Sequence, residues 1–449
     1  MNTPQLCVSL LESVRASGVE PSRYEAGKCL SERGGAPLLF VDGIISTFGT
    51  QVDWMNRRDF LISVGTIAAF GSIPFMRRLT PPKAMAIRNA YSLWYNRPAT
   101  VDIPGGFCLG YVTSSGEVSV VGVTDRLLLG KKVRLHTFDD ASDHGSPSLL
   151  KVPSGKHAGH ILACFSNHAT PLLCARTTRP ESIESWEETR IIDLGRSTYV
   201  SLAALADGQI ILMHTLQERT GKYSTGEWRR VVARTTQDGG DTWSEPVQIA
   251  GFGPGTFPYS TPLAVAKDGR CAMSYAIYSA VEKRHQGLTV IVTGDAFQSK
   301  VEIPVDLGTE ASADTVPYET KWLSERVIAV SYSQVSDAGK IALGRVALVD
   351  VTRRQLLSNT PVSEVAVHTY AGGVAIAADG LSVVYSPVAG GIVRQNLETG
   401  ETVSLVEAGD FSSPSFITSQ SQTLIVALKN PSIKTTRLFS AEVLVMPGT

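Results

Sequence analysis

Short, dense apolar segments alternate with polar, glycine-containing turns along most of the chain after its first hundred residues. Several segments follow one order, in which an apolar stretch leads through an Asp-Gly or Ser-Gly turn to a second, denser apolar stretch. Apolar runs bounded by glycine turns in this way predict buried β-strands joined as antiparallel hairpins. The clearest copies run over Pro147–Phe165, Tyr199–Met213, Tyr259–Tyr275 and Tyr370–Tyr385, and weaker copies over Gly105–Val123, Pro317–Tyr332 and Ser413–Leu428.

The copies recur at intervals of roughly 50 to 60 residues, a period that suits one four-stranded sheet with its loops. This repeat predicts an all-β chain that forms a single β-propeller, with seven four-stranded antiparallel blades. Six blades result if the first and last segments close one blade together. The 449 residues, 43% of them hydrophobic, and the 40 glycines fit one large domain built from many small sheets.

The octapeptide Thr236–Trp243 has the pattern T-x-D-x-G-x-T-W. We expect Asp238 to accept backbone N–H groups of its own turn, and Gly239 and Gly240 to supply the positive φ that such a turn needs. Trp243 is expected to pack between sheets. The pattern resembles the Asp box, or BNR repeat, of sialidase-like β-propellers. This resemblance implies that Asp238 lies in a strand-connecting turn at the outer rim of the ring.

The N-terminal region has a different composition. The segment Met55–Leu61 contains two adjacent arginines, an apolar run follows over Phe60–Phe75, and Ala84–Ala86 offers small residues for cleavage. The region resembles a twin-arginine signal peptide, which implies an exported protein, periplasmic or extracellular, with no stable membrane insertion after signal removal. A buried helix or a membrane anchor is the alternative. The predicted organisation is 1–54, an accessory extension or an untranslated segment; 55–86, the signal peptide; and 87–449, the propeller.

Charge and cysteine content narrow the classes of partner. The formal net charge is −1, so no basic field favours nucleic acid. The six cysteines do not form a spaced disulfide framework, and we expect buried free thiols, with a pair between Cys164 and Cys174 as the alternative. Neither a C-x-x-C nor an H-E-x-x-H pattern occurs, so no metal and no cofactor are predicted.

Polar residues gather at the starts of the repeated strands, where a propeller builds ligand sites over its central channel. Between Trp94 and Tyr278, their order and spacing resemble BNR-repeat proteins related to the propeller-fold polysaccharide lyases that act on ulvan-type uronic acid polymers. The resemblance implies a polysaccharide or oligosaccharide substrate. It is carried by Tyr95–Pro98, Gly110–Ser114, Asp143–Leu149, Ser166–His168, Ser185–Trp186, Thr198–Tyr199 and the Asp-box octapeptide.

The chemistry of these lyases accounts for the residue types. β-Elimination needs a base for the proton α to the uronate carboxyl, a donor or cation that neutralises the carboxylate, and an acid for the departing oxygen. By resemblance, Tyr199 is the base and acid, and His144 and His168 contact the carboxylate or the leaving oxygen. The same resemblance implies that Tyr259 and Asn167 bind substrate.

The chain departs from that family in two places. The carboxylate-neutralising arginine is expected at the end of the strand after the tyrosine, where this chain has His214 and Thr215. A later histidine of the lyases is also missing, with Tyr275 and Tyr278 near its position. The arginines available instead are Arg219 and, on the next predicted strand, Arg229, Arg230 and Arg234, of which Arg219, Arg230 and Arg234 are the predicted substrate-binding residues.

Three functions fit the sequence: a secreted polysaccharide lyase that acts on an acidic glycan, which is favoured, a non-catalytic glycan-binding propeller, and a sialidase-like glycoside hydrolase. The hydrolase lacks support, because the Arg-Ile-Pro motif is missing and no spacing marks a pair of catalytic carboxylates. We expect His144, His168, Tyr199 and Tyr259 to meet around one mouth of the channel, within about 10 Å of one another. The histidines predicted to be surface or structural residues are His136, His157, His160 and His285.

Overall fold

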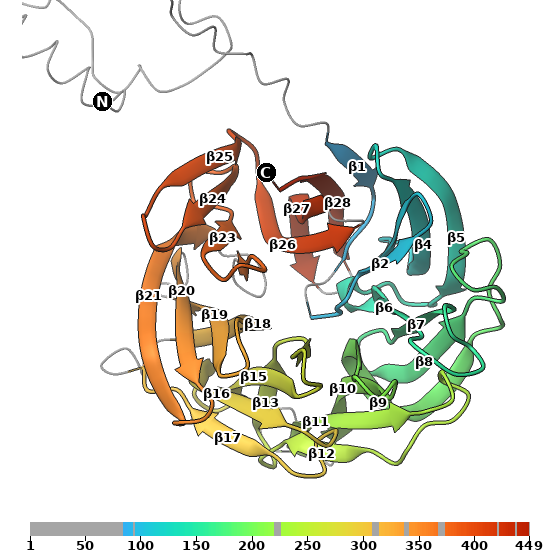
Figure 1. Cartoon of the computed structure of the whole chain (residues 1–449), viewed down its shortest axis with the longest axis horizontal. Coiled ribbons are helices and arrows are strands. Elements are labelled where there is room, and N and C mark those ends of the chain that lie inside the picture. Colours follow the sequence, from blue (N-terminus) through green and yellow to red (C-terminus); the bar gives the residue numbers. More distant parts are fainter. Residues whose placement is uncertain are drawn as a thin grey trace, which may run out of the picture. The chain divides into compact units, whose positions relative to one another are not determined.

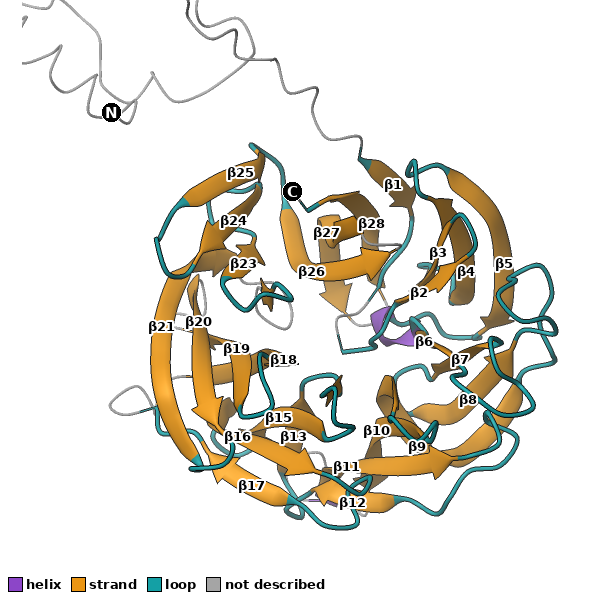
Figure 2. Cartoon of the chain, in the orientation of Figure 1, coloured by secondary structure: helices purple, strands orange, loops and turns teal. Residues whose placement is uncertain are grey.

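The computed structural model describes residues 84–92, 95–219, 226–307, 314–335, 341–366, 373–419, 422–435 and 438–448. Antiparallel sheets stand side by side around a common centre (Figure 1), which confirms the predicted all-β propeller. The regular elements with described bounds are strands, apart from one short 3-10 helix, η1 (Asp143–Gly145). Figure 2 shows η1 on the inner side of the ring.

Three sheets are four-stranded meanders, in which each strand pairs with the next one along the chain. Burial is greatest inside the sheet and falls towards the rim: in the first of them the innermost strand is half-buried, the second is fully buried and the fourth is mostly exposed. These sheets are β2 (Thr100–Ile103), β3 (Gly106–Val112), β4 (Glu117–Thr124) and β5 (Leu129–Thr137); β18 (Asp314–Trp322), β19 (Val327–Val335), β20 (Ile341–Asp350) and β21 (Gln355–Ala366); and β22 (Val374–Ile376), β23 (Ser382–Tyr385), β24 (Ile392–Asn396) and β25 (Thr402–Val406).

Two further sheets depart from this plan. In a seven-stranded sheet, the 15-residue strand β9 (Arg190–Ala204) pairs with one neighbour through its first half and with another through its second half, so two four-stranded groups share it. In a five-stranded sheet, two short strands in succession pair with the same neighbour. The remaining strands are β6 (Ser148–Lys151), β7 (Ile161–Phe165), β8 (Thr170–Arg176), β10 (Ile210–Arg219), β11 (Glu227–Thr236) and β12 (Val247–Ala250); and β13 (Thr256–Ser260), β14 (Ala264–Val265), β15 (Cys271–Ser279), β16 (Arg284–Thr293) and β17 (Val301–Pro304).

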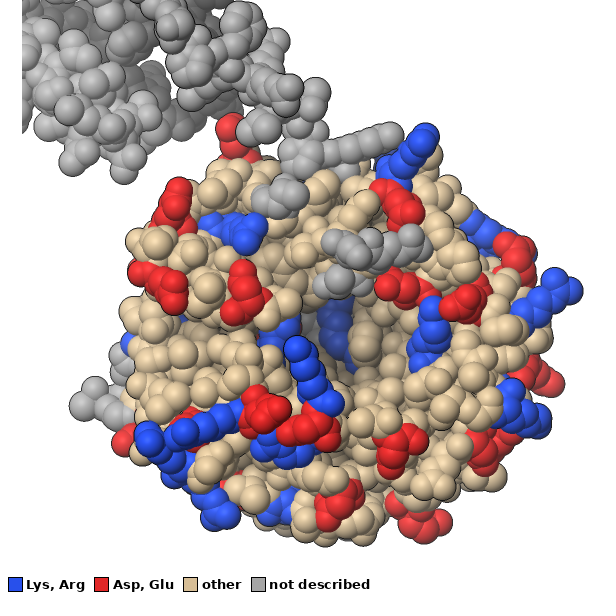
Figure 3. Space-filling model, in the orientation of Figure 1, with Lys and Arg blue, Asp and Glu red and all other residues tan. Residues whose placement is uncertain are grey.

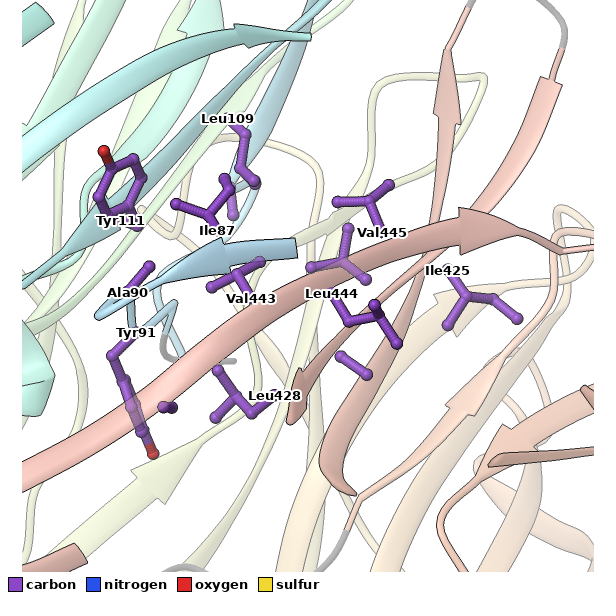
Figure 4. Packing of buried hydrophobic residues seen from close by; sticks show 14 of the residues in the cluster. Ile87, Ala90, Tyr91, Leu109, Tyr111, Ile425, Leu428, Val443, Leu444 and Val445 are labelled. Carbon is purple, nitrogen blue, oxygen red and sulfur yellow. The ribbon is translucent and has the colours of Figure 1, made fainter. Parts of the chain in front are cut away.

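The last sheet joins the two ends of the described chain. Strand β1 (Met85–Arg88) pairs with β28 (Leu438–Pro447), which continues to β27 (Gln422–Thr435) and β26 (Phe411–Ser419). Apolar side chains from both ends pack in one buried cluster (Figure 4). The prediction of seven blades fits this arrangement if β9 is counted in both groups of the seven-stranded sheet.

The start of β1 bears on the predicted signal peptide. Met85 and Ala86 fall inside the segment assigned to the signal, yet they pair with Val445 and Leu444. Cleavage that preserves this strand therefore has to occur before Met85. Residues 55–83 of the predicted signal and the 1–54 extension lie outside the described residues. Within the described part of the chain, no helix has the length and apolar character needed to cross a membrane.

The repeated Asp-Gly turns join the first and second strands of their blades, as the sequence predicts. Gly208, Gly269 and Gly380 all have φ near +69° to +89°, the left-handed region that glycine adopts without strain. In each turn the preceding aspartate accepts a backbone N–H two residues later, at 2.9 to 3.1 Å. The same local chemistry therefore sets the register of the inner hairpin in three separate blades.

The octapeptide turn connects β11 to β12, and its contacts match those expected of an Asp box. Thr236 Oγ1 donates to Asp238 Oδ1 at 2.7 Å, and the backbone N–H of Thr242 donates to the same carboxylate at 2.9 Å. Trp243 is half-buried against a cluster that contains residues of β6 to β10, so it packs between the two groups that share β9.

A second turn, between β16 and β17, has the same hydrogen-bond pattern, although its sequence does not match that of the octapeptide. Thr293 Oγ1 donates to Asp295 Oδ1 at 2.8 Å, and the backbone N–H and the hydroxyl of Ser299 donate to Asp295 at 2.8 and 2.6 Å. Phe297 occupies the position that corresponds to Gly240 of the octapeptide and has φ +71°. The turn thus tolerates a bulky residue where the octapeptide has Gly240.

The cysteines in the described residues are free and buried, as predicted. Cys164 and Cys174 are direct partners across β7 and β8, but both carry thiols. Burial raises the pKa of Cys271 to about 12, so this thiol stays protonated at neutral pH. Cys7 and Cys29 lie outside the described residues.

Candidate active site

Tyr199 lies at a β-bulge in β9 with a backbone conformation that is rare for its residue type. Two residues of β9, Tyr199 and Val200, stand opposite His214 of β10. The bulge gives Tyr199 a φ of +53°, in the left-handed region, and its side chain is only 4% exposed. Such a conformation costs about 1–3 kcal/mol and persists only where the surroundings impose it. The strand is therefore deformed at the residue predicted to exchange protons.

His144 connects Tyr199 to a buried carboxylate. It lies in η1, whose N-cap Ser142 accepts the backbone N–H of His144. Its Nδ1 is 2.5 Å from Asp143 Oδ1, and its Nε2 is 3.0 Å from the Tyr199 hydroxyl. A carboxylate only accepts hydrogen bonds, so Nδ1 carries the hydrogen and Nε2 accepts the phenolic hydrogen of Tyr199. Asp143 and His144 are both fully buried, which strengthens this chain electrostatically.

Asn96 fixes the two partners relative to each other. Its Nδ2 donates to the carbonyl oxygens of His144 at 2.8 Å and Ser146 at 2.7 Å. Its Oδ1 accepts the backbone N–H of Val200 at 2.9 Å. One buried amide therefore ties η1 to the bulge of β9. The sequence places Asn96 in a motif of the resemblance but gives no sign of this clamp.

Three tyrosines, Tyr95, Tyr199 and Tyr259, have their rings in mutual contact, with Tyr95 and Tyr259 6.1 Å apart, and we term them the tyrosine row, with Tyr199 and Tyr259 as its two ends. Ring centroids lie 4.4 Å apart for Tyr95 and Tyr199 and 5.8 Å apart for Tyr199 and Tyr259. At one end, His144 is 5.0 Å from Tyr199 and 4.8 Å from His168. The structure thus brings His144, His168, Tyr199 and Tyr259 together, each within 6 Å of the next.

Asn167, predicted to bind substrate, is buried beside these residues. Its Nδ2 donates to the carbonyl oxygen of Asp140, and its backbone N–H donates to Thr170 Oγ1 at 2.8 Å. Asn167 therefore anchors the segment that leads into η1. Its Oδ1 is buried without a hydrogen-bond partner among the described residues.

The predicted arginines take other places. Arg219 is exposed at the end of β10. Arg230 forms an ion pair with Glu218, and Arg234 with Asp193. Arg230 is thus paired with a carboxylate of β10, and Arg234 with a carboxylate of β9.

Arg229, the neighbour of Arg230, contacts the tyrosine row instead. Successive residues of a strand face opposite sides of the sheet, so the two arginines point apart. Arg229 is 5% exposed, and its Nη1 donates to the Tyr259 hydroxyl at 3.1 Å. Its guanidinium carbon lies 5.5 Å from the Tyr259 ring and 5.0 Å from the Phe257 ring. Arg229 reaches Tyr259 because alternate residues of β11 face opposite sides of the sheet, which the sequence pattern alone does not reveal.

His285 occupies the far end of the row. It is predicted to be a surface or structural residue, but its ring is 4.8 Å from Tyr259 and 5.0 Å from Tyr278. Its Nδ1 is 2.7 Å from Asp314 Oδ1, and its Nε2 is buried without a hydrogen-bond partner among the described residues. Burial acts to raise the pKa of Asp314, but the hydrogen bond and charge of His285 lower it overall.

His214, which stands where the family has arginine, supplies no positive charge. It is fully buried, and its Nδ1 is 3.2 Å from Ser197 Oγ. Burial and the nearby Arg234 lower the pKa of His214 to about 3, against the opposing effect of Asp193. His214 is therefore neutral at ordinary pH, and this departure from the family is not compensated at the same position.

A cavity of about 300 Å³ lies between the innermost strands, next to the tyrosine row but not lined by it. Figure 3 shows the ring hollowed at its centre, with Lys and Arg side chains on the wall. Arg97, the residue after Asn96 in the sequence, lines this cavity together with Tyr318 and Glu319 of β18. Among the described residues, no group of three or more His, Cys, Asp or Glu side chains is arranged to hold a metal ion. The absence of a metal or cofactor remains a prediction from the sequence.

No protein-family model and no curated protein sequence matches the chain. Solved structures do match. One is an ulvan lyase, PL25, bound to -[GlcA(1-4)Rha3S]-, with a TM-score of 0.57, 12% identity, and coverage of 81% of this chain and 94% of that chain. Another is the BP39L lectin from Burkholderia pseudomallei, with a TM-score of 0.52, 13% identity, and coverage of 78% and 93%. At these identities the likeness establishes the fold, a propeller of the kind found among carbohydrate-active proteins.

Proposed function

We propose that this protein is a polysaccharide lyase that cleaves a uronate-containing glycan by β-elimination. The observation that carries the proposal is the buried chain Asp143–His144–Tyr199, which ends at a tyrosine held with positive φ. The order of motifs shared with ulvan-type lyases supports it, as does the fold likeness to an ulvan lyase.

The geometry gives each member of the chain a step. Asp143 holds the hydrogen on Nδ1 of His144, so Nε2 takes the phenolic proton of Tyr199. The Tyr199 oxygen removes the proton α to the carboxyl, and that electron pair forms a double bond to the adjacent carbon. The bond from this carbon to the glycosidic oxygen breaks, and Tyr199 returns the proton to the departing oxygen. His144 then gives the phenolic proton back, which restores the starting state.

The test is a panel of acidic polysaccharides, each paired with its carboxyl-reduced form. We expect absorbance at about 235 nm, from the unsaturated uronate, with at least one acidic polymer and with none of the reduced forms. Tyr199→Phe should lower kcat by at least about 100-fold while glycan binding persists, because only the hydroxyl is lost. Tyr385→Phe, a buried tyrosine of β23, is the matched control.

Other outcomes would decide for the competing functions. New reducing ends without absorbance would replace the lyase by a hydrolase. Binding of a glycan with neither signal would leave a glycan-binding propeller, a role that the fold shares with a lectin.

Export is a separate proposal, since the segment that carries it lies outside the described residues. We propose that residues 55–84 direct export through the twin-arginine pathway. Replacing Arg57 and Arg58 by Lys should block secretion, because that pathway recognises the guanidinium pair. Normal export of the double-lysine variant would refute the assignment.

A further inference from the structure

Tyr259 is enclosed from two sides by groups that come from different strands. Arg229 of β11 donates to its hydroxyl, and its guanidinium lies near the Tyr259 ring. His285 of β16 meets the same ring edge-on, with an interplanar angle of 74°. Both side chains are positioned by packing: Arg229 against Phe257, and His285 against Tyr278. Aromatic neighbours therefore hold both side chains at this end of the tyrosine row.

The donors at this end suit a carboxylate. A guanidinium presents five N–H donors in one plane, a fork that matches the two oxygens of a carboxylate. Asp314 holds Nδ1 of His285, which turns Nε2, an atom without a hydrogen-bond partner among the described residues, into the ring nitrogen available to a ligand. The Arg229 guanidinium at the Tyr259 hydroxyl gives an anion charge-assisted hydrogen bonds, and the His285 ring beside Tyr259 supplies a further nitrogen.

The positive charge of Arg229 also acts on Tyr95, another member of the tyrosine row. Burial raises the pKa of Tyr95 well above its usual value, with Tyr199 and Tyr259 adding to the effect, and Arg229 is the group that opposes it. Tyr199 and Tyr259 are neighbours, with centroids 5.8 Å apart. In a uronate, the carboxyl carbon is bonded directly to the carbon that loses its proton. A carboxylate held near Tyr259 therefore presents that proton towards Tyr199.

We propose that Arg229, Tyr259 and His285 form a subsite for the carboxylate of an acidic sugar, in place of the strand position occupied by neutral His214. The inference rests on the proposed function for the type of ligand, a uronate. It divides the site into a proton-transfer end, at His144 and Tyr199, and a charge-binding end around Tyr259.

The test measures binding rather than turnover. The probes are an oligosaccharide of the repeat [GlcA(1-4)Rha3S] and its carboxyl-reduced form, titrated calorimetrically into the full chain carrying Tyr199→Phe to prevent cleavage. We expect the acidic form to bind at least about 10-fold more tightly, as hydrogen bonds to a charged group typically contribute. Arg229→Gln should bring that ratio close to one and leave the affinity for the reduced form within about twofold.

Arg230→Gln is the matched control, because Arg230 faces the other side of β11 and pairs with Glu218. It should leave the ratio unchanged. Arg229→Lys and His285→Gln, checked for folding by circular dichroism, provide second variants if Arg229→Gln unfolds, and each should lower the ratio several-fold.

The outcomes separate this inference from the lyase assignment. A ratio that survives in every folded Arg229 variant overturns the subsite, as does failure of the parent to prefer the acidic form. Loss of the ratio without any product at about 235 nm from wild-type protein upholds the subsite and refutes the lyase. Product formation by the wild-type protein, together with an unchanged ratio in Arg229→Gln, upholds the lyase and refutes the subsite.

Discussion

The two ends of the tyrosine row each contain a histidine bound through Nδ1 to an aspartate, but they are assembled differently. At one end Asp143 and His144 are adjacent in sequence and share η1. At the other, His285 belongs to β16 and Asp314 to β18, 29 positions apart and in neighbouring sheets. The first pair is fully buried, while the side chains of the second are 15% and 33% exposed.

Under the proposed function, this difference in burial suits the two ends to a division of labour between proton transfer and charge binding. A pair that is sealed from water keeps its proton assignment and interacts strongly, which suits repeated proton transfer. A partly exposed pair can exchange water for a ligand, and its interaction with that ligand is weakened by solvent. We therefore expect substitutions at the first end to affect the rate and those at the second to affect binding.

The largest expected effect comes from neutralising the two aspartates in turn. Asp143→Asn should lower kcat by about 100- to 10,000-fold, because an amide can present N–H to His144 and leave the hydrogen off Nδ1. Asp314→Asn should lower kcat by less than about tenfold and raise KM instead. Steady-state kinetics on an active acidic polymer measures both. Equal losses of kcat in the two variants would refute the division of labour.

The sequence singles out both residues of the first end but, of the second, only Tyr259, and the reason is physical. His144 and Tyr199 belong to local motifs whose spacing is visible along the chain. Arg229 and His285 reach Tyr259 because of strand alternation in β11 and the pairing of β16 with β15, where His285 stands opposite Tyr278. Which face an arginine takes depends on register, and register follows from the folded sheet. Arg230, which the sequence predicts to bind substrate, is the adjacent residue of β11 and faces the other side of the sheet.

The fold shows the same contrast. The Asp-Gly turns and the Asp238 octapeptide carry their conformation in their residue types, so the blades could be predicted from them. The Asp295 turn does not show the octapeptide pattern in its sequence, because Phe297 stands at the glycine position and Ser299 replaces threonine. Its hydrogen bonds, however, are the same. A pattern defined by residue type fails where the structure conserves only the contacts.

Asn96 offers the next largest effect, because it links both partners of the proton-transfer end. Asn96→Ala leaves three buried backbone groups without their partner, and we expect a loss of about 3 kcal/mol in the free energy of unfolding. Turnover should fall as well, since η1 and the bulge are no longer tied. Urea denaturation and kinetics measure the two effects. The control is Asn396→Ala in an exposed turn, expected to cost under about 1 kcal/mol and no activity. A stable, fully active Asn96→Ala would show that packing alone positions Tyr199.

Substitutions in the Asp238 and Asp295 turns should affect stability without affecting activity. Asp238→Ala and Asp295→Ala each remove several hydrogen bonds from a partly exposed loop, so each should lower the free energy of unfolding by about 1–2 kcal/mol. Neither should change kcat, because both turns join the outer strands of their blades. Similar losses would confirm that the Asp295 turn is equivalent to the octapeptide turn. A loss confined to Asp238 would mean that the Asp295 contacts contribute little.

The smallest effect is the pH dependence of the octapeptide turn. Burial acts to raise the pKa of Asp238, but hydrogen bonds from Thr242 and Thr236 lower it to about 2. A pKa lowered by folding means that the unfolded chain takes up the proton first, so the stabilisation is complete above the unfolded value of about 3.9 and is lost as the pH falls towards 2. The difference in unfolding free energy between wild type and Asp238→Asn, about 1 kcal/mol at pH 7, should therefore be constant down to about pH 5 and shrink below it. Asp295, whose pKa is also lowered, first of all by its hydrogen bonds to Ser299, should give the same trend in Asp295→Asn. A difference that grows on acidification would mean that the carboxylate is not the form that these hydrogen bonds stabilise.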